Sequence, residues 1–278
     1  MIGIQVNTLH ELESLVKVTD ILQIDVLQLF LKIPFEFSRK NFFHIQSIFN
    51  TLKKTYAIKK IYIHAPDHLL LNGSGRKSRI LQWKRLKEML NQTSYLGGDG
   101  VIAHLQFSEH ATIHELAEES DMVFWNQPPS IPLVLENVIK QHSIGSNLAM
   151  MSDFIRLIRQ SLYCEVCLDT AHLYQTGYRF HDKEEAFLLK EAHPYLFQHT
   201  TVLHINDSKM PINSHLDWHE HLGRGYIGLG SLGAFISLFD HSKAFIIETP
   251  KKRFDDFIAN TDILRRLVSG NIKTESIE

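Results

Sequence analysis

Only two cysteines occur among the 278 residues of the chain, and other features of specialised protein classes are missing as well. No disulfide framework is therefore expected, and a reducing intracellular compartment fits. No apolar stretch approaches the length of a membrane span, and the N-terminal residues MIGIQV show neither a basic region nor a cleavage signal. We therefore expect a cytoplasmic protein that makes no contact with a membrane.

The chain also has no strong charge of either sign, because 29 basic and 31 acidic residues leave a net charge of -2. The overall charge does not indicate a polyanionic partner, so any such partner must be held by local basic patches or by bound metal ions. No glycine-rich turn follows the first apolar run, which argues against a dinucleotide-binding sheet.

What the chain does contain is a regular alternation of short apolar runs and longer amphipathic stretches. Strands are predicted near residues 2–6, 24–30, 60–64, 100–105, 132–136, 164–169, 200–205 and 244–248. Helices are predicted near residues 9–20, 40–56, 76–95, 112–121, 147–161, 183–193, 231–240 and 254–268. This alternation predicts a closed (β/α)8 TIM barrel of the α/β class, with one domain at residues 1–268 and a polar tail at 269–278. An open, doubly wound sheet is the alternative.

The two cysteines, Cys164 and Cys167, form a C-x-x-C motif of the kind found in zinc and redox sites. They lie in a predicted strand, where residues three apart point to opposite faces. No second pair of cysteines exists. Both are therefore expected to be buried core residues.

Nine residues of metal-binding type stand near the ends of the predicted strands or in the segments that follow them. They are His64, His104, Glu136, Asp169, His172, His204, Asp217, His219 and Glu248. Neutral imidazole and carboxylate groups are common ligands of divalent transition metals. Because the strands of such a barrel deliver their carboxyl ends to one face, these side chains are expected to meet there. The pattern predicts a multinuclear metal site at that face.

Each of these residues also has a structural interpretation when it is taken alone. A single histidine or acid at the end of a strand is more often a hydrogen-bonding group than a ligand. Asp169 could be the N-cap of a helix. Asp217 and His219 lie in the polar segment HLDWHEHLG, where His215 or His221 could substitute, or where the loop is merely solvated. Nine matches in order are poorly explained by nine independent structural roles.

The segments CLDTAHLYQTGY, LHINDSK, DWHEHLGRGYIG, LENV and IIETP together resemble the endonuclease IV family of apurinic/apyrimidinic endonucleases. The resemblance runs in order from about Ile61 to Pro250. It implies a barrel that holds three zinc ions, with manganese as an alternative in some sites. It also implies hydrolysis of DNA on the 5′ side of an abasic site, leaving a 3′-hydroxyl, as in base excision repair.

The resemblance implies how the nine residues divide among the metals. The three implied sets are His64, His104 and Glu136; Glu136, Asp169, His204 and Glu248; and His172, Asp217 and His219. Two close metals can share a bridging carboxylate and a bridging hydroxide that forms near neutral pH. Glu136 and Glu248 are therefore the predicted catalytic residues, and Glu248 is the candidate for orienting or deprotonating the nucleophile.

The loops expected to contact DNA depart from the family's usual sequence. The family commonly reads Lys-Asn-Pro-Arg-x-Trp after the second strand, where this chain has Lys-Ile-Pro-Phe-Glu-Phe at residues 32–37. The family's Asp-Arg-His is Asp-Trp-His at residues 217–219. The candidates for contact with abasic DNA are Phe35, Trp218, Lys251, Lys252 and Arg253. Packing of the aromatic residues at the barrel rim is the structural alternative, and the protein is expected to be a monomer.

Two other functions remain as alternatives. A single-metal sugar isomerase or epimerase of the related xylose isomerase-like barrels would need only Glu136, Asp169, His204 and Glu248. Such an enzyme has no use for the other five residues. A non-catalytic binding protein on the same barrel is the third interpretation, and the loss of a bridging acid would favour it. No such acid is lost.

Overall fold

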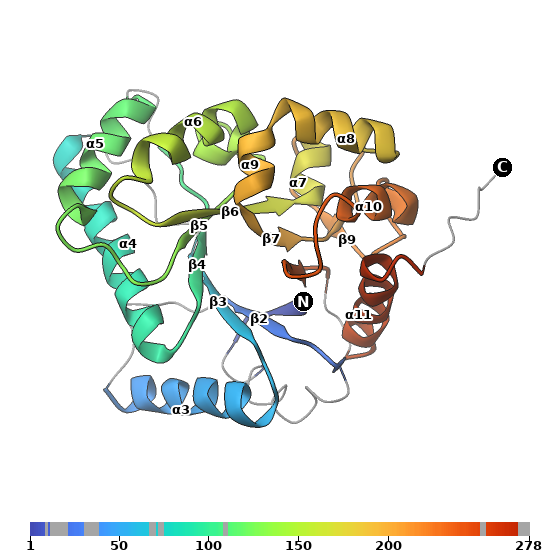
Figure 1. Cartoon of the computed structure of the whole chain (residues 1–278), viewed down its shortest axis with the longest axis horizontal. Helices are drawn as coiled ribbons and strands as arrows, with labels where there is room; N and C mark the ends of the chain where they lie inside the picture. Colours follow the sequence, from blue (N-terminus) through green and yellow to red (C-terminus); the bar gives the residue numbers. More distant parts are fainter. Residues whose placement is uncertain are drawn as a thin grey trace.

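The eight predicted strands form a closed parallel barrel. The computed structural model describes residues 1–8, 11, 22–30, 39–66, 71, 75–107, 111–250 and 254–271, and its barrel strands follow the order β1-β10-β7-β6-β5-β4-β3-β2 (Figure 1). The strands are β1 Ile2–Val6, β2 Val26–Leu29, β3 Lys60–His64, β4 Gly100–Ala103, β5 Leu133–Glu136, β6 Cys164–Asp169, β7 Thr200–His204 and β10 Ala244–Ile247. Each lies within its predicted run. The prediction of a (β/α)8 barrel is confirmed, and the open sheet is excluded.

Helices surround the barrel on its outer side (Figure 1). Those that match predicted segments are α3 Arg39–Thr55, α4 Arg76–Leu96, α5 Ile113–Phe124, α6 Leu148–Ile158, α8 Lys183–Ala192, α10 Gly228–Ile236 and α11 Phe254–Val268. The helix predicted near residues 9–20 lies outside the described residues except for Glu11, which is helical. In the part of the chain that the structure describes, no helix has the length and apolar character needed to cross a membrane.

Several short elements near the strand ends are absent from the sequence prediction. They are the 3-10 helix Ile144–Ser146, α7 Thr170–Gln175, α9 Pro194–His199, and an antiparallel pair of strands, β8 Asp207–Ser208 and β9 His219–Glu220. Elements of two to six residues are too short for hydrophobic periodicity to reveal them. Two of them, α7 and β9, carry predicted ligands.

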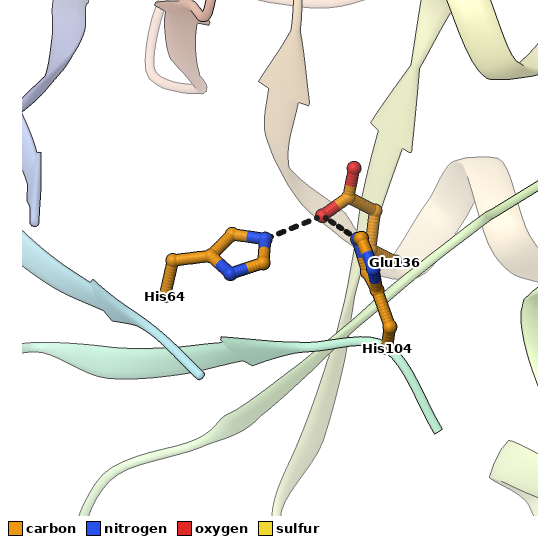
Figure 2. A group of neighbouring side chains, drawn as sticks. All are labelled: His64, His104 and Glu136. Carbon is orange, nitrogen blue, oxygen red and sulfur yellow. Dashed lines mark hydrogen bonds and ion pairs between the residues drawn. The ribbon is translucent and has the colours of Figure 1, made fainter. Parts of the chain in front are cut away.

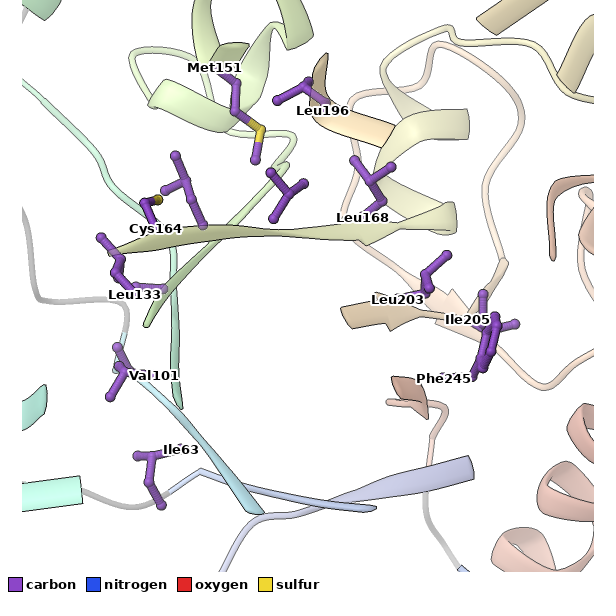
Figure 3. Packing of buried hydrophobic residues seen from close by; sticks show 14 of the residues in the cluster. Ile63, Val101, Leu133, Met151, Cys164, Leu168, Leu196, Leu203, Ile205 and Phe245 are labelled. Carbon is purple, nitrogen blue, oxygen red and sulfur yellow. The ribbon is translucent and has the colours of Figure 1, made fainter. Parts of the chain in front are cut away.

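Alternation along the strands divides the buried residues into two layers. Residues that face the helices form the larger cluster, part of which Figure 3 shows. Residues that face the barrel interior form a smaller cluster of Val26, Tyr62, Ile102, Val134, Cys167, Val202, Ala244 and Ile246. The barrel interior is therefore filled by an apolar layer. The next inward-facing residue of each strand, two positions later, lies above this layer.

The two cysteines fall into different layers. Cys164 belongs to the outer cluster and Cys167 to the interior one, and both are free thiols. Burial raises the pKa of each thiol to about 12. The prediction that both are buried core residues is confirmed.

The end of the chain is described only as far as residue 271, so residues 272–278 lie outside the described part. The boundary between a domain at residues 1–268 and a polar tail at 269–278 therefore stays a prediction.

Candidate metal centre

One polar side chain from each strand of the barrel stands above the apolar interior layer. The residue two positions after an interior residue faces the same way, because side chains alternate along a strand. This spacing leads from Tyr62 to His64 and from Val134 to Glu136. The complete layer is Gln5, Gln28, His64, His104, Glu136, Asp169, His204 and Glu248. All of the predicted ligands that end a barrel strand therefore meet at one face.

His64, His104 and Glu136 form the first group of possible ligands, and Figure 2 shows both rings turned toward the carboxylate. Glu136 Oε2 lies 3.3 Å from His64 Nε2 and 3.1 Å from His104 Nε2. His64 Nδ1 donates a hydrogen bond of 2.8 Å to the carbonyl oxygen of Ala65. Since a carbonyl oxygen only accepts, Nδ1 carries the proton, and the lone pair of Nε2 in the neutral ring faces Glu136. A lone pair and a carboxylate that face each other are suited to share a cation.

Glu136, Asp169, His204 and Glu248 form a second group, whose ligand atoms lie within 4.8 Å of one another. His204 Nδ1 lies 3.0 Å from Glu136 Oε1, 3.2 Å from Glu248 Oε2 and 3.9 Å from Asp169 Oδ2. The two oxygens of Glu136 therefore face different groups, Oε2 the first and Oε1 the second. A carboxylate that bridges two cations has this arrangement.

His172, Asp217 and His219 lie together on the solvent side of the centre. Asp217 Oδ1 lies 3.2 Å from His172 Nε2 and 3.3 Å from His219 Nε2. His172 Nδ1 donates to the carbonyl oxygen of Asn137 at 2.9 Å, which turns its Nε2 toward this group. Asp169, His172 and His219 also have ligand atoms within 4.8 Å of one another. The third group therefore adjoins the second through Asp169.

Two short elements bring the third group to the barrel. Asp169 is the N-cap of α7, because its carboxylate accepts a hydrogen bond of 2.8 Å from the N–H of His172. The structural interpretation of Asp169 is therefore correct and compatible with a place among the ligands. β9 pairs with β8, which follows β7, and so holds His219 beside the barrel. His215 is exposed and the ring of His221 is hydrogen-bonded to Asn260 of α11, so neither histidine substitutes for the predicted pair.

Burial and opposite charges compete within the centre. Burial raises the pKa of Glu136, but positive charge on the neighbouring histidines, His204 first, outweighs burial and holds this pKa well below its usual value. Burial lowers the pKa of His172, but the neighbouring carboxylates, Asp169 first, hold it well above its usual value. Carboxylates packed this closely require positive charge nearby, which either protonated imidazoles or bound cations can supply.

The residues fit a divalent transition metal. Imidazole and carboxylate groups form the ligand sets of zinc and manganese sites. His219 Nε2 is buried and forms no hydrogen bond to any residue that the structure describes, although Asp217 Oδ1 lies 3.3 Å away. A buried polar atom without a hydrogen bond is destabilising unless something else satisfies it. A metal ion at the third group would satisfy this nitrogen.

Asn206 orients two of the predicted ligands and is not among the predicted site residues. Its Nδ2 donates to Asp169 Oδ2 at 2.6 Å, and its Oδ1 accepts from the backbone N–H of Glu248 at 2.8 Å. The signal in the sequence is its position, two residues after His204 at the end of a strand.

Asp207 shapes the loop that follows β9, and it too is missing from the prediction. Its carboxylate accepts hydrogen bonds from the N–H groups of Gly223, Gly225 and Ile227 at 3.0, 3.1 and 2.9 Å. A Cβ at Gly225 would lie 2.3 Å from the carbonyl oxygen of Ser208, so no side chain fits there. Asp207 is therefore an anchor of the loop and not a ligand.

Trp218 projects from the loop between two predicted ligands, and 56 % of its side chain is exposed. Its carbonyl oxygen accepts hydrogen bonds of 3.0 Å from Lys209 N and from Gln175 Nε2. Lys209 Nζ lies 5.5 Å from the centre of the indole ring. An anchored backbone thus presents an aromatic face beside the centre. The other predicted DNA contacts, Phe35, Lys251, Lys252 and Arg253, lie outside the described residues.

Comparisons with known proteins agree with the fold and with the family resemblance of the sequence. The family model for xylose isomerase-like TIM barrels matches residues 61–267. The crystal structure of endonuclease IV from Thermus thermophilus superimposes with a TM-score of 0.72 at 20% sequence identity, covering 97% of this chain and 99% of that chain. The protein is therefore a xylose isomerase-like TIM barrel.

Sequence relatives narrow this class. The chain is 32% identical over 192 residues to "Probable endonuclease 4" of Halothermothrix orenii. This match covers 65% of this chain and 68% of that protein. A shorter match, 43% identical over 107 residues, is to "Probable endonuclease 4" of Sulfurihydrogenibium sp. and covers 37% of this chain and 38% of that protein. The chain belongs to the endonuclease IV family, and the resemblance inferred from its motifs is confirmed.

Proposed function

We propose that the protein is a zinc-dependent apurinic/apyrimidinic endonuclease, which hydrolyses the phosphodiester on the 5′ side of abasic sites in DNA during base excision repair. The observation that carries this proposal is the meeting of all nine predicted side chains in three adjoining groups. A mononuclear site needs about four ligands. Nine side chains of this type support a centre of several metal ions.

The proposed ligands divide among three zinc ions, with manganese as an alternative in some sites. The three sets are His64, His104 and Glu136; Glu136, Asp169, His204 and Glu248; and His172, Asp217 and His219. Zinc bound in such a centre makes hydroxide available near neutral pH and offsets the negative charge of the phosphate. The protein's own contribution is to place the ligands and to admit the phosphodiester from the side of Asp217, whose side chain is 58% exposed.

Glu136 and Glu248 are the proposed catalytic residues. Glu136 is fully buried, and its two oxygens fix the spacing between the first and second groups. Glu248 remains 10% exposed, and its Oε2 faces the second group. It is therefore placed to orient the attacking water and to accept its proton. Attack at phosphorus breaks the bond to the 3′-oxygen, which leaves a 3′-hydroxyl on one strand end and a 5′-phosphate on the abasic side.

The proposed partner is DNA that contains abasic sites, bound by a monomer inside the cell. Trp218 would stack on a base or fill the space of the missing one, because its ring is exposed and its backbone is anchored. Phe35 is a second candidate for contact with a base, and the basic residues Lys251, Lys252 and Arg253 would hold phosphates.

A single-metal sugar isomerase or epimerase is the second candidate function. The observation in its favour is that four residues form a complete group by themselves: Glu136, Asp169, His204 and Glu248. The observation against it is that the other five predicted ligands adjoin this group instead of lying apart from it. The number of bound metals therefore distinguishes the two functions.

The decisive experiment uses duplex DNA with a single tetrahydrofuran abasic analogue. Purified protein is incubated with this duplex and with an intact control duplex, with and without added zinc or manganese, and the product ends are mapped. We expect a metal-dependent cut on the 5′ side of the analogue that leaves a 3′-hydroxyl. Hydrolysis of another phosphodiester without cleavage of this duplex would overturn the repair function and retain the metal chemistry.

A further inference from the structure

Gln28 is a polar residue of the barrel interior to which the metal centre assigns no ligand role. It stands in the apolar strand β2, with the sequence VLQL, and its side chain is fully buried. Burying a side-chain amide in such a strand is unfavourable unless its donors and acceptor are hydrogen-bonded. The partners of Gln28 therefore indicate its purpose.

The amide of Gln28 is hydrogen-bonded through both of its ends. Its Oε1 lies 2.7 Å from His204 Nε2, and its Nε2 donates to Glu248 Oε1 and to Gln5 Oε1, both at 2.6 Å. The amide cannot be reversed, because its oxygen would then face the carboxylate of Glu248. Its orientation is fixed by its surroundings.

This orientation determines which nitrogen of His204 is available to a metal. An amide oxygen only accepts, so His204 Nε2 carries the proton and Nδ1 holds the lone pair of the neutral ring. Nδ1 is the nitrogen that lies 3.0 Å from Glu136 Oε1 and 3.2 Å from Glu248 Oε2. The same amide occupies Glu248 Oε1 and leaves Oε2 toward the second group.

The geometry points to Gln28 as a positioning residue of the metal centre, which fixes the tautomer of His204 and the rotation of the Glu248 carboxylate. The inference rests on the proposed function in one respect, namely that the second group binds a metal. Gln5 of β1 holds Gln28 in turn. Strand β2 thus contributes a hydrogen-bonding residue that orients two proposed ligands, and β1 contributes the residue that holds Gln28.

The test compares two substitutions of Gln28 that remove its hydrogen bonds to His204 and Glu248 in different ways. Gln28→Met keeps the length of the side chain and removes its hydrogen bonds. Gln28→Asn keeps the amide but withdraws it by one methylene from His204 and Glu248. For each folded variant, zinc affinity is measured by competition with a chelator, and the visible absorption of the cobalt-substituted protein reports the ligand geometry. We expect one metal equivalent to bind about 10- to 100-fold more weakly, with a changed cobalt spectrum.

The matched control is Val26→Ala, two positions earlier on the same face of β2 and inside the apolar layer. It should lower the melting temperature and leave zinc affinity and the cobalt spectrum unchanged. Activity gives a further readout, because saturating zinc should restore the Gln28 variants if they are impaired only in holding the metal.

Two outcomes overturn the inference. One is a folded Gln28→Met or Gln28→Asn protein with the zinc affinity and cobalt spectrum of the parent. The other is a Val26→Ala protein that changes both in the same way, since the cause would then be general loosening of the barrel. If the parent protein binds several metals and cuts abasic DNA, either of these results in the variants leaves the proposed function intact. A parent that binds no metal overturns the proposed function itself.

Discussion

Three histidines of the candidate metal centre have one ring nitrogen fixed by a hydrogen bond, whereas the tryptophan beside them is anchored through its backbone. His64, His172 and His204 each have one nitrogen hydrogen-bonded to a neighbouring oxygen and the other turned toward a carboxylate. Trp218 lies one residue from two proposed ligands, yet more than half of its side chain is exposed. The centre is thus fixed before any ligand arrives, while the rim offers surface to a partner.

This difference between the centre and the rim matches the places where the chain departs from the family's sequence. The positions that the centre needs carry the expected residue types, but a tryptophan replaces the family's arginine at position 218. Catalysis requires ligands placed in advance, because misplacement at the metal is costly. Contact with DNA tolerates several solutions, since phosphates and stacked bases can be held by different side chains. The chemistry is therefore expected to follow the family and the grip on DNA to differ.

The largest effect is expected from Glu136→Gln and Glu248→Gln, which should each lower the rate of abasic-site cleavage by about two to four orders of magnitude. Both carboxylates face the metal groups and not the outer core, so the barrel should remain folded. Single-turnover cleavage gives the rate, and circular dichroism checks the fold. Full activity in either variant, with unchanged metal content, would remove that residue from the mechanism.

Removal of the metals should abolish activity and lower the melting temperature, because the carboxylates of the centre would lose the cations that they face. Elemental analysis of protein purified without chelator should give a metal-to-protein ratio well above one. Added zinc should restore both activity and melting temperature after dialysis against a chelator. A reproducible ratio of one or less would favour the isomerase alternative.

The meeting of the proposed strand-end ligands could be predicted because two regularities coincide at their positions. Each stands two positions after an interior residue of its strand, as Glu136 does after Val134, and parallel strands bring such residues to one face. His219 is different, because it reaches the centre on the two-residue strand β9, which has no periodicity of its own. Its place among the proposed ligands was indicated by the resemblance to the endonuclease IV family and not by alternation along a strand.

Gln28 could not be recognised from the sequence for another reason. A single glutamine in an apolar run shows that something polar must face it, but not what that is. Its acceptor contact to His204 joins residues 176 positions apart, and only the closure of the barrel brings them together. The same holds for Asn206, whose partners Asp169 and Glu248 come from other strands.

At the rim, Trp218→Ala should weaken binding to abasic duplex by about 1–3 kcal/mol if the ring stacks on a base. Metal content should be unchanged, because the side chain contacts no proposed ligand in the described interactions and its backbone anchors remain. Binding is measured by fluorescence anisotropy with a catalytically inactive Glu136→Gln background, and Phe35→Ala is measured in parallel. Unchanged binding in both variants would show that neither Trp218 nor Phe35 contacts the DNA.

The smallest effect is expected from replacing Lys251, Lys252 and Arg253 together by Ser. These residues follow Glu248 by three to five positions, so they are candidates for phosphate contacts beside the centre. Each phosphate contact that is lost should reduce the slope of log K against log salt by about 0.9, and the loss of affinity should be similar for abasic and intact duplex. The measurement is a salt titration of binding with both duplexes. A parallel fall in affinity without a change in slope would show that the three residues act through the fold of their loop, whereas a flatter slope would separate this electrostatic grip from the specific contact of Trp218.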